Sequence, residues 1–142
     1  MTTPIWHAPA ALFLGTAMLL APAPGLGETP QLSIELNSAE GRDNGCQLVF
    51  VMQDGTGAGL EQLVLEVVLF DRTGGVSALS LLDFQDLPAD GTRVRSFNMP
   101  GLECGTLGRL LVNAVAACAP QGAPGCEALK LSSRIDTIEV LQ

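Results

Sequence analysis

The chain has 142 residues, with seven Lys and Arg against 15 Asp and Glu, so its formal net charge is −8. This length is typical of one domain, and an acidic chain lacks the basic surface that nucleic-acid phosphates require. From residue 28 onward the sequence contains no His, Trp or Tyr and a single Lys. Most side chains that commonly act as general bases are therefore missing, and we expect a protein that is not an enzyme and does not bind nucleic acid.

The first 27 residues differ physically from the rest because they contain no Asp, Glu, Lys or Arg. Residues 8–22 are mostly apolar but too few to span a bilayer, which needs about 20 apolar residues. Proline, glycine and other small residues follow, as before the cleavage site of an exported protein. The pattern predicts a signal peptide at 1–27 that is cleaved before Glu28, which leaves a periplasmic or secreted protein without a membrane span. An uncleaved anchor or a misplaced start codon is the alternative, because the leading residues contain no Lys or Arg.

All of the cysteines follow the predicted signal peptide, at Cys46, Cys104, Cys118 and Cys126. An even number of cysteines in an exported domain predicts disulfides. A bond between Cys118 and Cys126 would close a short loop, and a bond between Cys46 and Cys104 follows by elimination. Free buried thiols are the alternative.

No metal or cofactor site is predicted. The cysteine spacings contain no C-x-x-C and no His partner, so they fit neither a zinc site nor a redox motif. Two loops, 43–44 and 54–57, are rich in oxygen-bearing side chains. Calcium needs six to eight oxygen ligands, and neither loop has a recognisable set, so we interpret both as solvated turns.

Past residue 28, short apolar runs alternate with turn residues. Residues 32–37 and 46–52 place apolar side chains at every second position, which is the period of a half-buried strand. Residues 63–70 are nearly continuous Val and Leu, which predicts a central strand buried on both faces. Turn residues then lead into predicted strands at 76–84 and 93–99.

Two further strands complete the pattern. The run 107–118 is rich in small apolar residues and is predicted to be a strand, with a short helix near its start as the alternative. Its predicted inward residues are Leu110, Val112, Ala114, Ala116 and Cys118. The last predicted strand, 129–141, changes the parity of its apolar residues between Ile135 and Ile138, which predicts a bulge.

About seven short strands with frequent turns and no convincing helix are typical of an all-β fold. The pattern predicts an immunoglobulin-like antiparallel β-sandwich. No repeat or linker divides residues 28–142, so we expect them to form a single domain after the signal peptide at 1–27.

Several segments of the chain are similar in sequence to a known group of proteins. They are Val68-Leu69-Phe70-Asp71, residues 79–88, 93–97, 100–104 and 109–113. With these segments the chain resembles a group of small uncharacterised exported proteins of alphaproteobacteria, often labelled "Tat pathway signal sequence domain protein". The resemblance implies a periplasmic protein of unassigned activity. The first 27 residues depart from that label, because they contain no twin arginine.

The sequence offers one candidate polar cluster, formed by Asp83, Asp86, Arg93 and Arg95. Arg93 and Arg95 share one face of a predicted strand, and either aspartate can lie across from them after the turn. As a functional site, an arginine fork of this kind would receive a partner's carboxylate. As a structural feature, the same residues would form an ion pair that fixes the turn.

These observations together predict a non-catalytic binding or accessory module. Such a module would present a sheet face or an edge strand to an envelope protein. An enzyme with a carboxylate-based site and a purely structural envelope component are the alternatives. An exposed apolar patch or a bare edge strand would favour the binding module.

Overall fold

The computed structural model describes residues 1–5 and 27–142 of the chain. The predicted signal peptide at 1–27 therefore lies outside the described residues, apart from its two ends. The elements in chain order are β1 (Leu32–Arg42), β2 (Gly45–Asp54), β3 (Gln62–Asp71), β4 (Val76–Asp83), β5 (Thr92–Pro100), η1 (Cys104–Thr106), β6 (Leu107–Ala119), α1 (Pro124–Glu127), β7 (Leu129–Ser133) and β8 (Glu139–Leu141). Within the described ranges, neither helix has the length and apolar character that crossing a bilayer requires.

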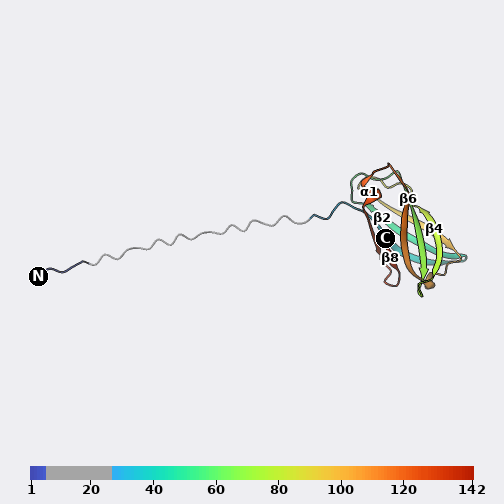
Figure 1. Cartoon of the computed structure of the whole chain (residues 1–142), viewed down its shortest axis with the longest axis horizontal. Coiled ribbons are helices and arrows are strands. Elements are labelled where there is room, and N and C mark those ends of the chain that lie inside the picture. The colour runs from blue at the N-terminus through green and yellow to red at the C-terminus, as the bar shows by residue number, and fades with distance from the viewer. Residues whose placement is uncertain (6–26) are drawn as a thin grey trace.

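The strands form two sheets of four that pack face to face (Figure 1). One sheet has the order β5-β2-β1-β7 and the other has the order β4-β3-β6-β8. The predicted all-β sandwich is therefore confirmed. The antiparallel neighbours β1–β2, β2–β5 and β3–β6 correspond to the A–B, B–E and C–F neighbours of an immunoglobulin-like sandwich.

Alternation of apolar and polar residues explains how the strands bury one face. In β1, Leu32, Ile34 and Leu36 are buried, whereas the residues between them are half-buried. The same period in β2 turns Leu48, Phe50 and Met52 toward the opposite sheet. Each strand of this kind contributes one row of side chains to a shared interior.

Three phenylalanines form the aromatic centre of that interior. Phe50, Phe84 and Phe97 meet edge to face, with ring centroids 5.0–5.9 Å apart. Such pairs add about 0.5–1.5 kcal/mol each beyond the burial of their area. Phe84 follows β4 and Phe97 lies in β5, so the cluster joins the edge strands of the two sheets.

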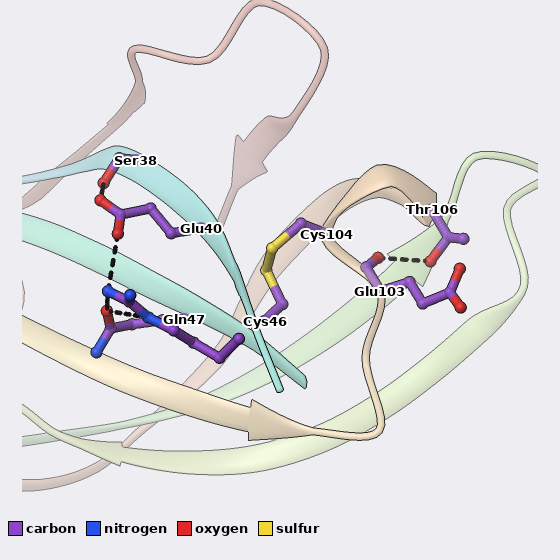
Figure 2. The surroundings of a disulfide bond; sticks show 8 residues. Ser38, Glu40, Cys46, Gln47, Glu103, Cys104 and Thr106 are labelled. Carbon is purple, nitrogen blue, oxygen red and sulfur yellow. Dashed lines mark hydrogen bonds and ion pairs between the residues drawn. A yellow bond between two sulfur atoms is a disulfide. The ribbon is translucent and has the colours of Figure 1, made fainter. Parts of the chain in front are cut away.

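The predicted disulfides are both present, as Cys46–Cys104 and Cys118–Cys126. The first joins the start of β2 to η1, as Figure 2 shows, and the second joins the end of β6 to α1. By the chain-entropy estimate, the longer loop contributes about 4 kcal/mol and the shorter about 2.5 kcal/mol. Two disulfides are typical of proteins from an oxidising compartment outside the cytoplasm.

The last predicted strand is wrong in one respect. Residues 129–141 form two strands in different sheets, since β7 pairs parallel with β1 and β8 pairs parallel with β6. Ile135 and Ile138 lie in the turn between them, where the N–H of Ile138 donates to the C=O of Ile135 over 2.9 Å. The change of parity therefore marks a crossing between sheets and not a bulge. It also gives the sandwich eight strands, with two parallel pairs at its edges.

The predicted inward face of 107–118 is partly wrong. Leu110 and Val112 are buried in β6, but Ala114 and Ala116 are exposed. The reason is that β6 has three extra residues opposite β3, at Gly108, Asn113 and Ala116, where the register shifts, and the shifts at Asn113 and Ala116 fall among the predicted inward residues. Each shift reverses the parity of the strand, so that Ala114 faces outward. After the shift at Ala116, Cys118 faces inward again, as predicted.

Candidate functional site

Three of the four residues in the predicted polar cluster come together at one end of the sandwich. Asp86 lies between the two arginines of β5, with Oδ2 3.3 Å from Nη2 of Arg93 and Oδ1 3.1 Å from Nη2 of Arg95. Asp83 does not join them. Its Oδ1 accepts the N–H of Gln85, which has a positive φ of 59°, and this bond turns the chain after β4.

Arg95 has the contacts of a structural residue. Its Nε donates to the C=O of Phe84 over 2.8 Å, and its Nη2 also donates to the C=O of Asp86 over 3.2 Å. The Arg95 side chain is 19% exposed, against 39% for Arg93. Arg95 therefore ties the segment after β4 to strand β5, and this geometry favours the ion pair that fixes the turn.

Asp54, which we interpreted as part of a solvated turn, is instead 4% exposed. Its Oδ1 accepts the N–H and the hydroxyl of Thr56, over 2.9 and 2.6 Å. Its Oδ2 accepts the N–H groups of Gly59 and Asp90, each over 3.0 Å. One carboxylate therefore joins the loop after β2 to the loop before β5.

The same bonds decide the ionisation of this carboxyl group. Burial alone would raise the pKa of Asp54, but the hydrogen bonds from Thr56, Asp90 and Gly59 outweigh burial and lower it below its usual value. The sequence contains a signal for this turn, because the pattern Asp-x-Thr of residues 54–56 occurs again at residues 71–73. There Oδ1 accepts the N–H and hydroxyl of Thr73, and the pKa of Asp71 is also lowered, first by the Thr73 hydroxyl. Short Asp and Thr side chains commonly bond to the backbone of their own turn in this way.

No other cluster in the described ranges resembles a catalytic or metal site. Among these residues, His, Cys, Asp and Glu do not gather in groups of three or more that could hold a metal ion. A surface pocket of about 590 Å³ lies beside the first disulfide, where Asp43 and Glu103 are among the residues that line it.

The two sheets differ in their outer faces. The outer face of β2 and β5 includes polar residues such as Gln47, Gln53 and Asn98. The outer face of the other sheet is mainly apolar. We call it the outer apolar face, and its residues are Val64, Val68, Phe70, Val76, Leu79, Leu81 and Leu111. The predicted burial of β3 on both faces is confirmed only in part, because on its outer face Val68 is buried whereas Val64 and Phe70 are half-buried.

The most exposed part of the outer apolar face lies on β4, at the margin of its sheet (Figure 1). Val76, Leu79 and Leu81 are 67%, 63% and 60% exposed. β4 contains no charged residue before Asp83 at its end. An edge strand without proline, and without charge before its last residue, is the kind of edge that other strands pair with.

The backbone of β4 also has unpaired groups. The N–H of Phe84 donates to the C=O of Leu63 in β3 over 2.8 Å. Because bonded and non-bonded pairs alternate in antiparallel strands, counting back by twos from Phe84 shows that Ser80 also points its N–H and C=O toward β3. The N–H and C=O groups of Leu79 and Leu81 therefore point away from β3. On that side no strand pairs with them in the described part of the chain. We call residues 77–83 of β4, with these outward groups, the β4 edge.

Strand β5, an edge strand of the other sheet, is protected. It carries Arg93 and Arg95, and it ends at Pro100. Charged side chains and prolines on an edge disfavour the addition of a further strand. Of these two edge strands, β5 is guarded and β4 is open. The β4 edge is the candidate functional site.

Comparison with protein families, with curated proteins and with solved structures finds no match to this chain.

The structural role of Arg95 is testable by substitution. Arg95→Ala is expected to lower the free energy of unfolding by about 1.5–3 kcal/mol, because it removes charge-assisted bonds to the Phe84 and Asp86 carbonyls. Arg93→Ala serves as the matched control and should change stability by about 0.5 kcal/mol or less. Chemical denaturation at neutral pH measures both. Equal small losses in the two variants would contradict a structural tie and favour a recognition patch.

The lowered pKa of Asp54 predicts how stability depends on pH. A carboxyl group whose folded pKa lies below its unfolded pKa stabilises the fold above the unfolded value, and this contribution is lost as pH falls through the folded value. Asp54→Asn should therefore destabilise the protein by about 2 kcal/mol at pH 7 and less at about pH 2. Denaturation at a series of pH values checks this, with the exposed Asp136→Asn as the control for losing one charge. A pH-independent effect of Asp54→Asn would show that the ionised carboxylate is not the stabilising form.

Proposed function

We propose that this protein is an exported, non-catalytic binding module that accepts an extended segment of a partner protein along the β4 edge. The observation that carries the proposal is the coincidence of two features on one strand. The outward N–H and C=O groups of Leu79 and Leu81 are available for pairing, and the same two side chains are exposed on the outer apolar face.

Strand addition uses both features at once. Backbone hydrogen bonds along an added strand supply much of the affinity, and side chains at alternate positions supply the selectivity. On the accepting side these side chains are Leu79 and Leu81, which would pack against apolar residues of the partner. Burying them removes apolar area from water, which stabilises the complex by roughly 25 cal/mol for each Å² buried.

One hydrogen-bonded pair of polar side chains lies among the residues of the outer apolar face. The amide Nδ2 of Asn113 in β6 donates to Oε1 of Glu66 in β3, and Glu66 lies opposite Leu81 of β4. A partner segment that continues from the β4 edge onto this face would therefore meet one hydrogen-bonded polar group next to the apolar side chains. Polar groups placed within an apolar surface restrict the register of a partner more than they add affinity.

Three features support export and a partner in the cell envelope. Residues 1–27 carry no charge and have the composition of a signal peptide. All four cysteines are joined in disulfides. The net charge of −8 makes a nucleic-acid partner unfavourable. Under this proposal the partner is an envelope protein with a segment of alternating apolar residues, and no cofactor takes part.

Site-specific photo-crosslinking in the exporting cell tests the proposed function. A photoreactive amino acid at Leu79 is expected to form a covalent adduct with another polypeptide, because this side chain would lie next to a side chain of the added strand on the outer apolar face. Val94 is a closely matched control, since it is 59% exposed on the guarded edge strand β5. We expect adducts from position 79 and few from position 94. An absence of adducts at both positions, or equal adducts at both, would contradict the proposal.

A further inference from the structure

We infer that, when no other partner is bound, the β4 edge is occupied by β4 of a second copy of this chain. The two copies form a symmetric antiparallel pair in which Ser80 lies opposite Ser80 of the second copy. The inference rests on the proposed function, because it uses the same edge, and it adds the identity of one occupant. It follows from the sequence of β4, from the direction of its backbone groups and from its charges.

The direction of the backbone groups permits a two-fold pairing. Leu79 and Leu81 turn their N–H and C=O groups outward. With the axis at Ser80, Leu79 of each copy lies opposite Leu81 of the other. Both residues of each such pair then point their backbone groups at one another, so both pairs are hydrogen-bonded. The two facing Ser80 residues form the non-bonded pair between them.

The side chains select this register over its neighbours. With the axis at Ser80, leucine meets leucine twice on the outer apolar face, and Ser77 meets Asp83. An axis at Leu79 would place Leu81 opposite Ser77, and an axis at Leu81 would place Leu79 opposite the carboxylate of Asp83. Cross-strand pairs of like polarity stabilise a sheet, so the axis at Ser80 is favoured.

The charges of the edge are compatible with self-association although the whole chain carries −8. Asp83 is the one charged residue of β4, and in this register it faces Ser77. The two Asp83 residues lie at opposite ends of the pairing, roughly 20 Å apart at about 3.4 Å per residue. That separation exceeds the Debye length of about 8 Å at physiological ionic strength, so their repulsion is largely screened.

A symmetric pairing of this kind is unfavourable for strand β5. A β5–β5 pair would bring Arg93 and Arg95 of one copy close to those of the other. Like charges on directly opposed strands destabilise the pairing. Between the edge strands β4 and β5, self-association is therefore favoured at β4.

The contact is small, which determines the expected affinity. The pairing spans seven residues of one strand, and its large exposed side chains are Leu79 and Leu81. Stable interfaces bury about 800 Å² on each partner, and smaller ones are weak or transient. We therefore expect a reversible dimer with a dissociation constant in the micromolar range or weaker, which a partner with a better matched strand can displace.

Sedimentation velocity of the exported, disulfide-bonded protein tests the dimer. The sedimentation coefficient is expected to rise with concentration, up to about 1 mM. Leu79→Lys should weaken dimerisation at least tenfold, because it places a charge opposite Leu81 of the second copy. Val94→Lys, the matched change on β5, should leave dimerisation unchanged. A protein that stays monomeric throughout, or a Leu79→Lys variant that dimerises like the parent, would overturn the inference.

Leu81→Pro provides a second variant that removes a backbone donor. Its N–H points outward, so the substitution leaves the bonds to β3 in place, and prolines are tolerated on such positions of edge strands. It should abolish the dimer while thermal melting still shows a cooperative fold. A Leu81→Pro variant that remains folded and dimeric would overturn the pairing through the backbone. Leu79→Lys keeps the question answerable if the proline variant does not fold.

The register of the β4–β4 pairing can be measured separately by NMR. In a mixture of isotope-labelled and unlabelled copies, intermolecular NOEs are expected between the methyl groups of Leu79 and Leu81. Intermolecular NOEs that join Leu79 only to its own counterpart would overturn the axis at Ser80.

Photo-crosslinking from position 79 separates this inference from the proposed function. Adducts with twice the mass of the chain support the dimer. Adducts exclusively with a different protein overturn the dimer and leave the proposed function standing. The absence of any adduct overturns both.

Discussion

The alternation of backbone hydrogen bonds between β3 and β4 is the constraint on which the other features depend. It begins at the bond from Phe84 to Leu63, and it turns every second residue of β4 toward β3. The remaining residues, among them Leu79 and Leu81, then present both their backbone groups and their exposed side chains outward. A shift of this pairing by one residue would turn the two leucines toward the core and leave Ser80 on the outer face.

The segment that anchors this alternation is held firmly from the other sheet. Phe84 packs against Phe50 and Phe97, and its C=O accepts a hydrogen bond from Arg95. On the same side of the molecule, buried Asp54 joins the loops that precede β3 and β5. Arg95 and Asp54 therefore fix the segments on either side of β4 and β5, and the large side chains exposed on β4 are apolar. Our proposal that the protein recognises an extended strand rests on this distribution.

Local patterns were sufficient to predict most of the fold and insufficient wherever two strands had to be compared. Alternation predicted the β-sandwich, and spacing predicted both disulfides. The inward face of β6 was predicted wrongly at Ala114, because bulges depend on the register with β3, which one strand does not reveal. The same limit applies to the choice of Asp86 over Asp83 as the partner of the arginines, and to the bond from the distant Asp90 to Asp54. The open edge of β4 required the order of the strands, although its lack of charge is visible in the sequence.

Amide hydrogen exchange in β4 of the dilute, monomeric protein tests the account most directly. Exchange protection reports which N–H groups are hydrogen-bonded in the folded state. The account predicts alternation, in which the N–H groups of Ser80 and Leu82 are strongly protected and those of Leu79 and Leu81 exchange at rates near those of an unfolded peptide. Equal and strong protection of all four amides would show that the outward groups already have partners within one chain, and the β4 edge would not be an open binding site.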